Sequence, residues 1–344
     1  MKLPAHILII RLSALGDVAM TIPVLRVFAH TYPQVKLTVL SRPFFKPIFE
    51  DIPNCSFMDA DLYGRHKGLG LFLLAKEARS LGIDAVVDLH NVIRSKIITT
   101  YLNIFYGIIT SSIDKGRKEK RALINAHGGT IHLLKTTHKR YADVFSNLGY
   151  PIKLRDRIHR TRKPLNPRLH SLIEPLQKKV IGIAPFAAYE GKEYPFKLLE
   201  EVISRLDALG DCHIFMFGGG KNEIEILSAI EKVFPSVKNI AGQLTLEDEL
   251  ALISNLDVML SMDSGNGHLA AMFGVPVITL WGVTHPFAGF KPYNQPDINQ
   301  LCSDREKFPL IPTSIYGNKY PVEYENAMDT ISPEDVFAAI LRII

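Results

Sequence analysis

The chain has 344 residues, of which 47% are hydrophobic and 22% charged, and its formal net charge is +5. This composition excludes a disordered chain, and the length favours two domains of about 150–190 residues each. The apolar runs fall far short of the ~20 residues of a membrane-spanning helix, and three widely separated cysteines argue against a disulfide framework or a zinc site, so we expect a cytoplasmic protein.

The first half alternates strands and helices. Buried strands are predicted at 7–10, 35–41 and 85–89, and helical segments at 18–32, 44–52, 97–109 and 131–148. This alternation indicates a parallel sheet with helices on both faces. Ligands bind beyond the carboxyl ends of such strands, so the loops 13–17 and 88–95 are expected on one rim.

The second half repeats this pattern after a linker. Residues 151–167 lose periodicity and are rich in Arg, Lys and Pro, which places the domain boundary near residue 165. Strands are then predicted at 180–185, 213–217, 239–240, 256–260 and 275–280, and helices at 196–209, 223–234, 246–254 and 268–273. The chain is therefore predicted to be two similar α/β domains.

A final helix is predicted from Ser332 onward. Ser332 is the expected N-cap, and Pro333 occupies the first helical position. We expect this helix, 332–344, to pack back on the first domain.

The most specific signal is the segment 261–282, where a glycine-containing turn joins a strand to a helix. Asp263, Ser264, Gly265 and His268 stand where the first N–H groups of a helix and its positive dipole end attract an anion. A phosphate fits there best. Alternatively, Asp263 caps the helix and His268 is a satisfied surface histidine.

Other candidate residues also follow predicted strands. Asp17 is either a helix N-cap or a general base, and Ser13 is a supporting donor. Lys192 is either a surface lysine or a cation that neutralises a diphosphate leaving group. Three glycines at 218–220 permit close backbone approach, and Glu223 beyond them is a candidate partner for ribose hydroxyls. The Gly-x-Gly-x-x-Gly and Walker patterns are absent, which disfavours hydride transfer and nucleotide hydrolysis.

Positive charge gathers at 115–121, 135–140 and 153–163. No nucleic-acid-binding motif accompanies these clusters, so we expect no nucleic-acid partner. An anionic membrane surface, a phosphorylated acceptor and a merely solvated face remain open as explanations.

Four segments carry a family resemblance. They are 9–18 (IIRLSALGDV), Asp88-Leu89-His90 with Arg94-Ser95, 192–195 (KEYP) and 263–270 (DSGNGHLA). In this order, over nearly the whole chain, they resemble glycosyltransferase family 9, the heptosyltransferases of lipopolysaccharide core assembly. The resemblance implies a GT-B fold: two Rossmann-like domains with a cleft between them. Residues 1–165 would bind the acceptor, and residues 166–331 the nucleotide-sugar.

The resemblance also implies the chemistry and the roles of individual residues. The reaction would be a metal-independent, inverting transfer without a cofactor, with Asp17 as the base and Lys192 on the donor phosphates. The implied donor-binding residues are Asp263, Ser264, Gly265, His268, Glu223, Ala188 and Leu244, and the implied acceptor-binding residues are Ser13, His90 and Arg94. The expected partners are ADP-heptose and an anionic lipid-linked saccharide. The protein is expected to be a monomer that acts at the inner face of the cytoplasmic membrane.

Three positions depart from the family pattern. Ala187-Ala188 stands where hydroxyl residues are common, Tyr194 where Trp is common, and Asn266-Gly267 replaces a proline-containing pair. The sugar is therefore open. A nucleotide-sugar-binding protein that has lost catalysis and a sugar-nucleotide epimerase of the same fold are the alternatives.

Overall fold

The computed structural model of the chain describes residues 3–126, 128–154, 160–174 and 178–344. Parts of the expected linker 151–167 and of the basic cluster 153–163 lie outside these residues. The chain forms two compact units, and the first contains the described residues up to 115 together with 137–154. The remaining described residues, including the segment 116–136, belong to the second unit.

The grouping of the segment 116–136 differs from the boundary expected near residue 165. The physical reason is burial, because Leu123 and Ile131 pack against Ala288 and Phe287 of the second unit in one apolar cluster. A boundary placed from the composition of a linker cannot reveal such an excursion.

The first unit is built on a parallel sheet in the strand order β3-β2-β1-β4-β5. Its strands are β1 (His6–Ile10), β2 (Lys36–Ser41), β3 (Cys55–Asp59), β4 (Ala85–Asp88) and β5 (Ile109–Ser112). Ile9 lies opposite Val39 of β2 and Val87 of β4. Because both faces of β1 are covered, its whole apolar run is buried, as the sequence predicted.

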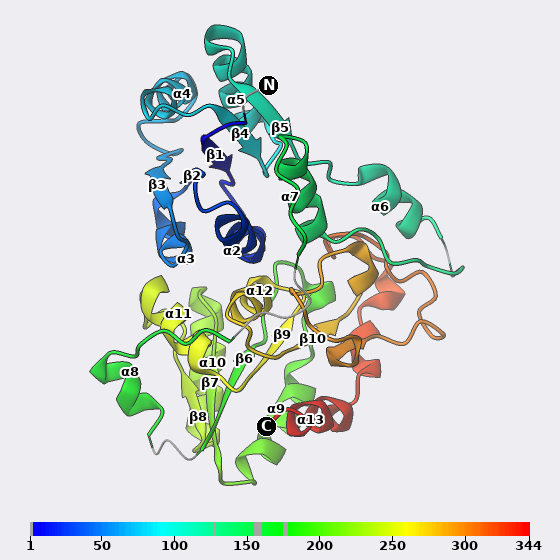
Figure 1. Cartoon of the computed structure of the whole chain (residues 1–344). Helices are drawn as coiled ribbons and strands as arrows, with labels where there is room; N and C mark the ends of the chain where they lie inside the picture. The colour runs from blue at the N-terminus through cyan, green and yellow to red at the C-terminus, as the bar shows by residue number, and fades with distance from the viewer. Residues whose placement is uncertain (1–2, 127, 155–159, 175–177) are drawn as a thin grey trace. The chain divides into compact units, whose positions relative to one another are not determined.

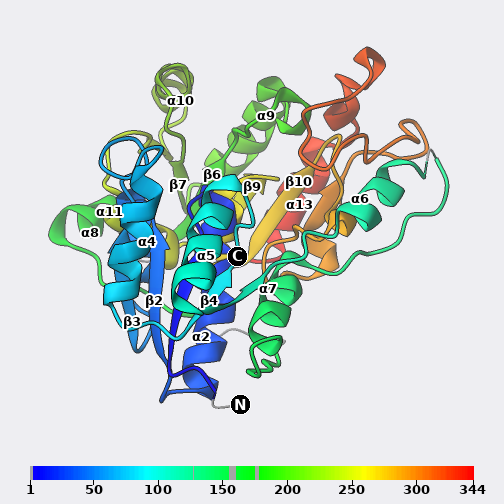
Figure 2. The same cartoon turned by 90° about the horizontal axis from the view of Figure 1, so that it is seen from above.

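Helices cover both faces of this first sheet (Figure 1). They are α1 (Leu15–Ala19), α2 (Thr21–Thr31), α3 (Lys46–Phe49), α4 (Gly70–Ser80), α5 (Ile93–Tyr106) and α7 (Thr137–Ser146), with the 3₁₀ turn η1 (Pro43–Phe45). Helices α4 and α5 lie side by side (Figure 2), where Leu74 and Ile98 pack on Leu8. On the opposite face, α2 meets α7 through the rings of Phe28 and Phe145, whose centroids are 4.6 Å apart.

The second unit contains a larger parallel sheet in the order β11-β10-β9-β6-β7-β8. Its strands are β6 (Lys179–Ala184), β7 (Cys212–Met216), β8 (Val237–Asn239), β9 (Val258–Met262), β10 (Val277–Trp281) and β11 (Gln300–Cys302). Its helices are α6 (Arg117–Ile124), α8 (Pro167–Leu172), α9 (Phe196–Asp207), α10 (Lys221–Val233), α11 (Leu246–Asn255), α12 (Gly265–Met272) and α13 (Pro333–Leu341). The 3₁₀ turns are η2 (Glu190–Lys192), η3 (Pro286–Ala288), η4 (Asp297–Asn299), η5 (Val322–Tyr324) and η6 (Ala327–Thr330).

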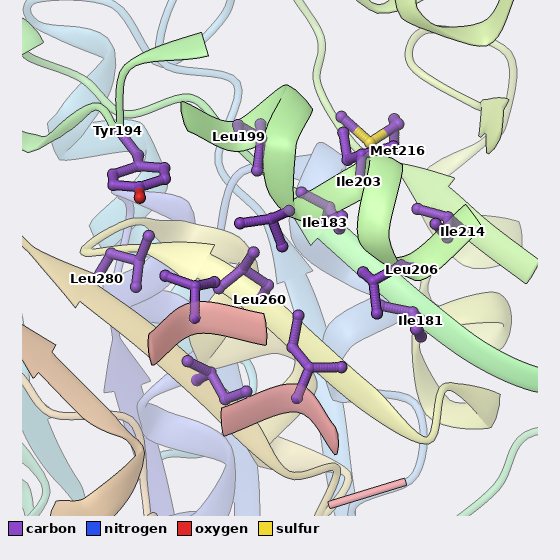
Figure 3. Packing of buried hydrophobic residues seen from close by; sticks show 14 of the residues in the cluster. Ile181, Ile183, Tyr194, Leu199, Ile203, Leu206, Ile214, Met216, Leu260 and Leu280 are labelled. Carbon is purple, nitrogen blue, oxygen red and sulfur yellow. The ribbon is translucent and has the colours of Figure 1, made fainter. Parts of the chain in front are cut away.

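The core of the second unit lies between this sheet and α9. Figure 3 shows Leu199, Ile203 and Leu206 of α9 packed over Ile183 and Ile214 of the sheet. The same cluster takes in apolar residues of α13, namely Val336, Ala339 and Ile340.

The position of α13 therefore differs from the expectation that it packs on the first domain. It lies against α9 because its apolar side is buried in the core of the second unit. Its start agrees with the sequence: the Ser332 hydroxyl accepts the N–H of Asp335 over 3.1 Å. Among the described residues, no helix is long and apolar enough to cross a bilayer.

In each sheet the strand order reverses beside the first strand of the unit. β1 lies between β2 and β4, and β6 lies between β7 and β9. Open α/β sheets bind ligands beyond the carboxyl ends of their strands at such a switch point. The loops after β1 and β4, and those after β6 and β9, therefore occupy the two positions that are favoured for ligands.

Candidate functional site

A buried ion pair occupies the switch point of the second sheet. Lys192 Nζ lies 3.1 Å from Asp263 Oδ2, and each side chain is only 11% exposed. The Thr284 hydroxyl donates to the same oxygen over 3.0 Å. These residues follow β6, β9 and β10 in turn. The structure thus joins two residues that the sequence singled out separately, and it adds Thr284, which the sequence analysis missed.

Glycines allow the backbone to bring Lys192 to this position. The Val283 N–H donates to the Gly191 carbonyl over 2.9 Å. A Cβ atom on Gly282 would lie 2.2 Å from that carbonyl oxygen, so no side chain fits there. Gly317, whose φ is +80°, packs on the aliphatic part of the Lys192 side chain. A Cβ atom on Gly317 would lie 2.6 Å from Lys192 Cδ, so this position also requires glycine.

Helix α12 begins directly after Asp263. Ser264 is its N-cap residue, in extended conformation, and its side chain forms no capping hydrogen bond. Ser264 and Gly265 are partly exposed, and His268 is buried one turn further on. The first N–H groups of a helix lack intrahelical partners and carry its positive dipole end. The predicted residues thus lie together in one turn that is suited to an anion, and Asp263 is not the cap.

Glu223 closes the glycine-containing loop after β7. Its Oε2 accepts the N–H groups of Gly219 over 2.7 Å and of Gly220 over 3.3 Å. This carboxylate therefore orders the loop and caps α10, a structural role that was not predicted from the sequence. Its contact with a ribose remains a prediction.

A separate pocket of about 490 Å³ in the second unit includes Ala188. Its lining residues are Ala187, Ala188, Tyr189, Glu190, Glu193, Gly317, Asn318 and Tyr320. The Ala187 N–H donates to Glu193 Oε1 over 2.9 Å, so this N–H is occupied within the protein. Burial raises the pKa of Glu193. The hydrogen bond from the Ala187 N–H lowers this pKa, whereas the negative charges of Glu223 and Glu190 raise it. Leu244, partly buried before α11, is not among the lining residues.

Asp17 lies at the switch point of the first sheet. It stands in the first turn of α1, whose N-cap is Ala14, so its interpretation as an N-cap is wrong. Arg11 Nη2 lies 2.5 Å from Asp17 Oδ2, and Arg11 Nη1 donates to the Leu89 carbonyl over 2.7 Å. Arg11 is almost completely buried although it is charged. Arg11 was not among the residues predicted for the site; its position directly after a buried strand was the available signal.

Ser13 and His90 meet on the same rim. His90 Nδ1 accepts the Leu12 N–H over 3.4 Å, which leaves the ring proton on Nε2, 3.5 Å from Ser13 Oγ. Burial, together with the charges of Arg11, Lys115 and Arg94, lowers the pKa of His90 to about 3. The ring is therefore neutral at physiological pH.

Arg94 lies close to this pair at the start of α5. Its exposed guanidinium lies 6.0 Å from the ring of Tyr63. The three predicted acceptor residues thus share one cationic region of the first unit. Within the part of the chain that the structure describes, no three His, Cys, Asp or Glu side chains are grouped as metal ligands.

Comparisons with known proteins agree with this architecture. Residues 72–312 match the profile of "Glycosyltransferase family 9 (heptosyltransferase)". A curated relative, the lipopolysaccharide core heptosyltransferase OpsX of Haemophilus influenzae, is 26% identical over 307 residues, which cover 86% of this chain and 83% of the relative.

Solved structures share the fold of this chain. The glycosyl transferase family 9 protein of Veillonella parvula superposes with a TM-score of 0.74 at 20% identity, over 100% of this chain and 98% of that one. The ADP-heptose lps heptosyltransferase II of E. coli gives 0.68 at 18% identity, over 98% of both chains. The predicted GT-B class is thus confirmed. Because the family profile covers most of its length, this chain belongs to glycosyltransferase family 9, the heptosyltransferases, and is a glycosyltransferase.

Proposed function

We propose that this enzyme transfers heptose from ADP-heptose to a lipopolysaccharide-core or related lipid-linked saccharide. Two of the proteins named above, OpsX and the E. coli protein, are heptosyltransferases of lipopolysaccharide, and the name of the E. coli protein specifies ADP-heptose. The observation that carries the proposal is the buried Lys192–Asp263 pair at the start of α12. A cation held beside a helix N-terminus is what a departing diphosphate requires.

In the donor half of the proposed reaction, Lys192 compensates the charge that develops on the diphosphate. Asp263 Oδ2 accepts a hydrogen bond from the Lys192 ammonium, and the Thr284 hydroxyl donates to the same oxygen. Asp263 thus holds the ammonium directly, and Thr284 fixes the carboxylate that holds it. The N–H groups of Ser264 and Gly265 bind phosphate oxygens, and His268 supports this turn. Glu223, Ala188 and Leu244 remain proposed contacts of the nucleoside.

In the acceptor half, Asp17 is the general base. Its Oδ2 is held by Arg11, and we assign Oδ1 to the acceptor hydroxyl. As the acceptor oxygen forms its bond to the anomeric carbon, the proton moves to Asp17 and the bond from that carbon to the diphosphate breaks. This single displacement releases ADP and inverts the anomeric configuration without requiring a metal ion. Ser13, His90 and Arg94 are the proposed contacts of an anionic acceptor.

The proposed setting is the cytoplasmic face of the inner membrane, where a monomer would meet its lipid-linked acceptor. These two relatives act on lipopolysaccharide or its core, as their names state.

The pair Ala187-Ala188 affects how the donor can be bound. Neither alanine supplies a hydroxyl group, and the Ala187 N–H already donates to Glu193.

The test of the donor is a thermal-shift panel of ADP-, GDP- and UDP-sugars. A ligand present at 100 times its dissociation constant adds about 2.7 kcal/mol to stability, which is readily measured. ADP-heptose is expected to raise the midpoint most. A larger shift with a GDP- or UDP-sugar would overturn the assigned donor.

The test of the base is transfer by Asp17→Asn, which keeps the size of the side chain and a hydrogen-bonding partner for Arg11. Transfer should be lost while the shift with ADP-heptose persists. Glu50→Gln, which neutralises an exposed carboxylate of the same unit, is the matched control and should remain active. Full activity of Asp17→Asn would refute the assigned base. Conversion of the donor without acceptor would indicate an epimerase, and binding without turnover by the wild-type enzyme a non-catalytic protein.

A further inference from the structure

Helix α5 is apolar on two sides. Its inner side places Ile98 and Leu102 in the core of the first unit. A second stripe follows the ~3.6-residue repeat beside this inner side: Ile97 and Tyr101 are partly buried against the same core, and Ile93, Ile104 and Phe105 extend the stripe into solvent. Ile93, Ile104 and Phe105 are 78%, 69% and 66% exposed. A surface helix of a globular protein normally presents polar residues there, so this stripe requires an explanation.

The neighbouring helix α4 extends the same apolar surface. Phe72 lies 5.4 Å from the ring of Tyr101, which in turn lies 4.6 Å from the ring of Phe105. Leu69 and Leu73 are exposed on the same side of α4 as Phe72. Because α4 and α5 lie side by side (Figure 2), these residues form one continuous surface, which we call the α4–α5 face.

Positive charge accompanies the α4–α5 face. Lys76 and Arg79 follow Phe72 by four and seven residues, so they lie on the same side of α4. The Arg79 guanidinium lies 5.7 Å from the ring of Tyr106, and the exposed Arg94 precedes Ile97 by three residues, on the same side of α5. The acidic residues of this region are engaged within the protein: Glu77 pairs with Arg65 and His66, the Asp84 carboxylate accepts backbone N–H groups, and Asp88 is buried.

From this combination we propose that the α4–α5 face docks on the surface of an anionic lipid bilayer. Exposed Ile, Leu, Phe and Tyr side chains enter the headgroup boundary, while Lys and Arg extend toward anionic headgroups. The face also begins at the rim of the acceptor residues, since α5 starts within a few residues of His90 and extends about 20 Å from it. The proposal rests on the proposed function in one respect: a lipid-linked acceptor brings the enzyme to a membrane.

A second copy of the chain is a poorer occupant. An isologous contact through this face would bring Lys76, Arg79 and Arg94 of both copies together, and like charges across an interface oppose association. An anionic bilayer attracts the same three residues.

The test is co-sedimentation of the purified full chain with lipid vesicles. Wild-type protein should bind vesicles containing about 30% phosphatidylglycerol more tightly than vesicles of phosphatidylcholine alone. Ile104→Ser/Phe105→Ser should weaken binding to both kinds of vesicle about tenfold or more. Lys76→Gln/Arg79→Gln should weaken binding about tenfold, and only to the anionic vesicles.

The matched control is Ile298→Ser/Val322→Ser, which removes two similarly exposed apolar side chains of the second unit, 62% and 75% exposed. Its vesicle binding should equal that of the wild type. Equal losses in this control and in Ile104→Ser/Phe105→Ser, or no loss in either, would overturn the proposal. Concentration-dependent dimerisation of the wild type that Ile104→Ser/Phe105→Ser abolishes would assign the face to a second copy instead. Thermal midpoints of all variants verify that they fold.

Transfer to a delipidated, water-soluble acceptor separates this inference from the proposed function. Ile104→Ser/Phe105→Ser should transfer to such an acceptor as fast as the wild type and lose activity only on acceptor embedded in vesicles. If the wild type binds vesicles through the α4–α5 face but transfers no heptose, the proposed function fails and the docking surface stands. If transfer is normal but vesicle binding does not depend on this face, the docking surface fails and the proposed function stands.

Discussion

Removing the charge of Asp263 should destabilise the second unit more than any comparable change at an exposed ion pair. Lys192 and Asp263 are 3.1 Å apart with side chains only 11% exposed. At an effective dielectric constant of about 20, two unit charges at this distance attract by about 5 kcal/mol. Breaking a buried pair from one side typically costs about 3–5 kcal/mol, since the remaining charge stays buried without a partner. We therefore expect Asp263→Asn to lower the free energy of unfolding by about 3–5 kcal/mol.

The matched control is Glu231→Gln, which breaks the pair of Lys238 with Glu231 in the same unit. These atoms are closer, at 2.8 Å, but the side chains are 51% and 27% exposed. Exposed pairs contribute about 0.2–1 kcal/mol, so Glu231→Gln should lose no more than that. The comparison shows whether burial or the distance between the charges determines how much an ion pair contributes to stability.

The assay is urea unfolding followed by the fluorescence of Trp281, the single tryptophan of the chain. Trp281 ends β10, is 1% exposed and donates to Gln300, so it reports unfolding of the second unit specifically. A reporter confined to one unit matters, because a chain of two units need not unfold in a single step. Lys192→Met/Asp263→Asn removes both charges and should be more stable than Asp263→Asn alone. Equal losses in Asp263→Asn and Glu231→Gln, or a double variant less stable than Asp263→Asn, would refute the reasoning.

Three further predictions concern other parts of the chain. Gly282→Ala should lower the free energy of unfolding by about 1–3 kcal/mol and weaken donor binding, because its Cβ would lie 2.2 Å from the Gly191 carbonyl oxygen. The control Gly219→Ala, whose Cβ meets nothing within 4 Å, should lower it little. Urea unfolding measures both variants, and equal losses of stability would contradict the role of the Gly191 contact. The pKa of His90 is lowered to about 3 in the fold, so the stability that its neutral form contributes is complete above the unfolded value of about 6.5 and declines as the pH falls from there toward 3. Stability of His90→Gln should accordingly fall less between pH 7 and 5 than that of the wild type, measured by circular dichroism in urea, and an unchanged pH dependence would contradict this. Burial raises the pKa of all three cysteine thiols to about 12, so iodoacetamide at pH 8 should label the folded chain far more slowly than the unfolded one; equal rates would show that the thiols are not protected.

Burial on both faces explains which elements could be predicted from the sequence. The central strands β1 and β6 are continuous apolar runs because parallel strands inside a doubly covered sheet have no solvent side. β3 and β5 escaped prediction because they lie at the edges of their sheet and mix polar with apolar residues. The predicted helix 131–148 begins only at Thr137, since the residues before it pack in the other unit.

The candidate site shows a similar division. The sequence predicted that Lys192 and Asp263 each follow a strand, and parallel topology then brings strand ends to one edge. It did not predict that the two side chains neutralise each other, because they are 71 residues apart and their contact depends on the close approach of Gly282 to Gly191. The Arg11–Asp17 pair was missed for a different reason. A role as helix cap offered a sufficient local explanation for Asp17, and only the folded structure shows the buried Arg11 beside it.

The excursion of residues 116–136 has a consequence for dissecting the enzyme into its parts. The backbone passes from the first unit to the second after residue 115, returns after residue 136, and crosses again before residue 160. A gene fragment that ends at residue 165 would carry Leu123 and Ile131 without the apolar cluster that buries them, and the complementary fragment would expose Ala288 and Phe287. The units are therefore continuous in space but interleaved along the chain. Independent expression of either one would require the excursion to be excised from the first and grafted onto the second.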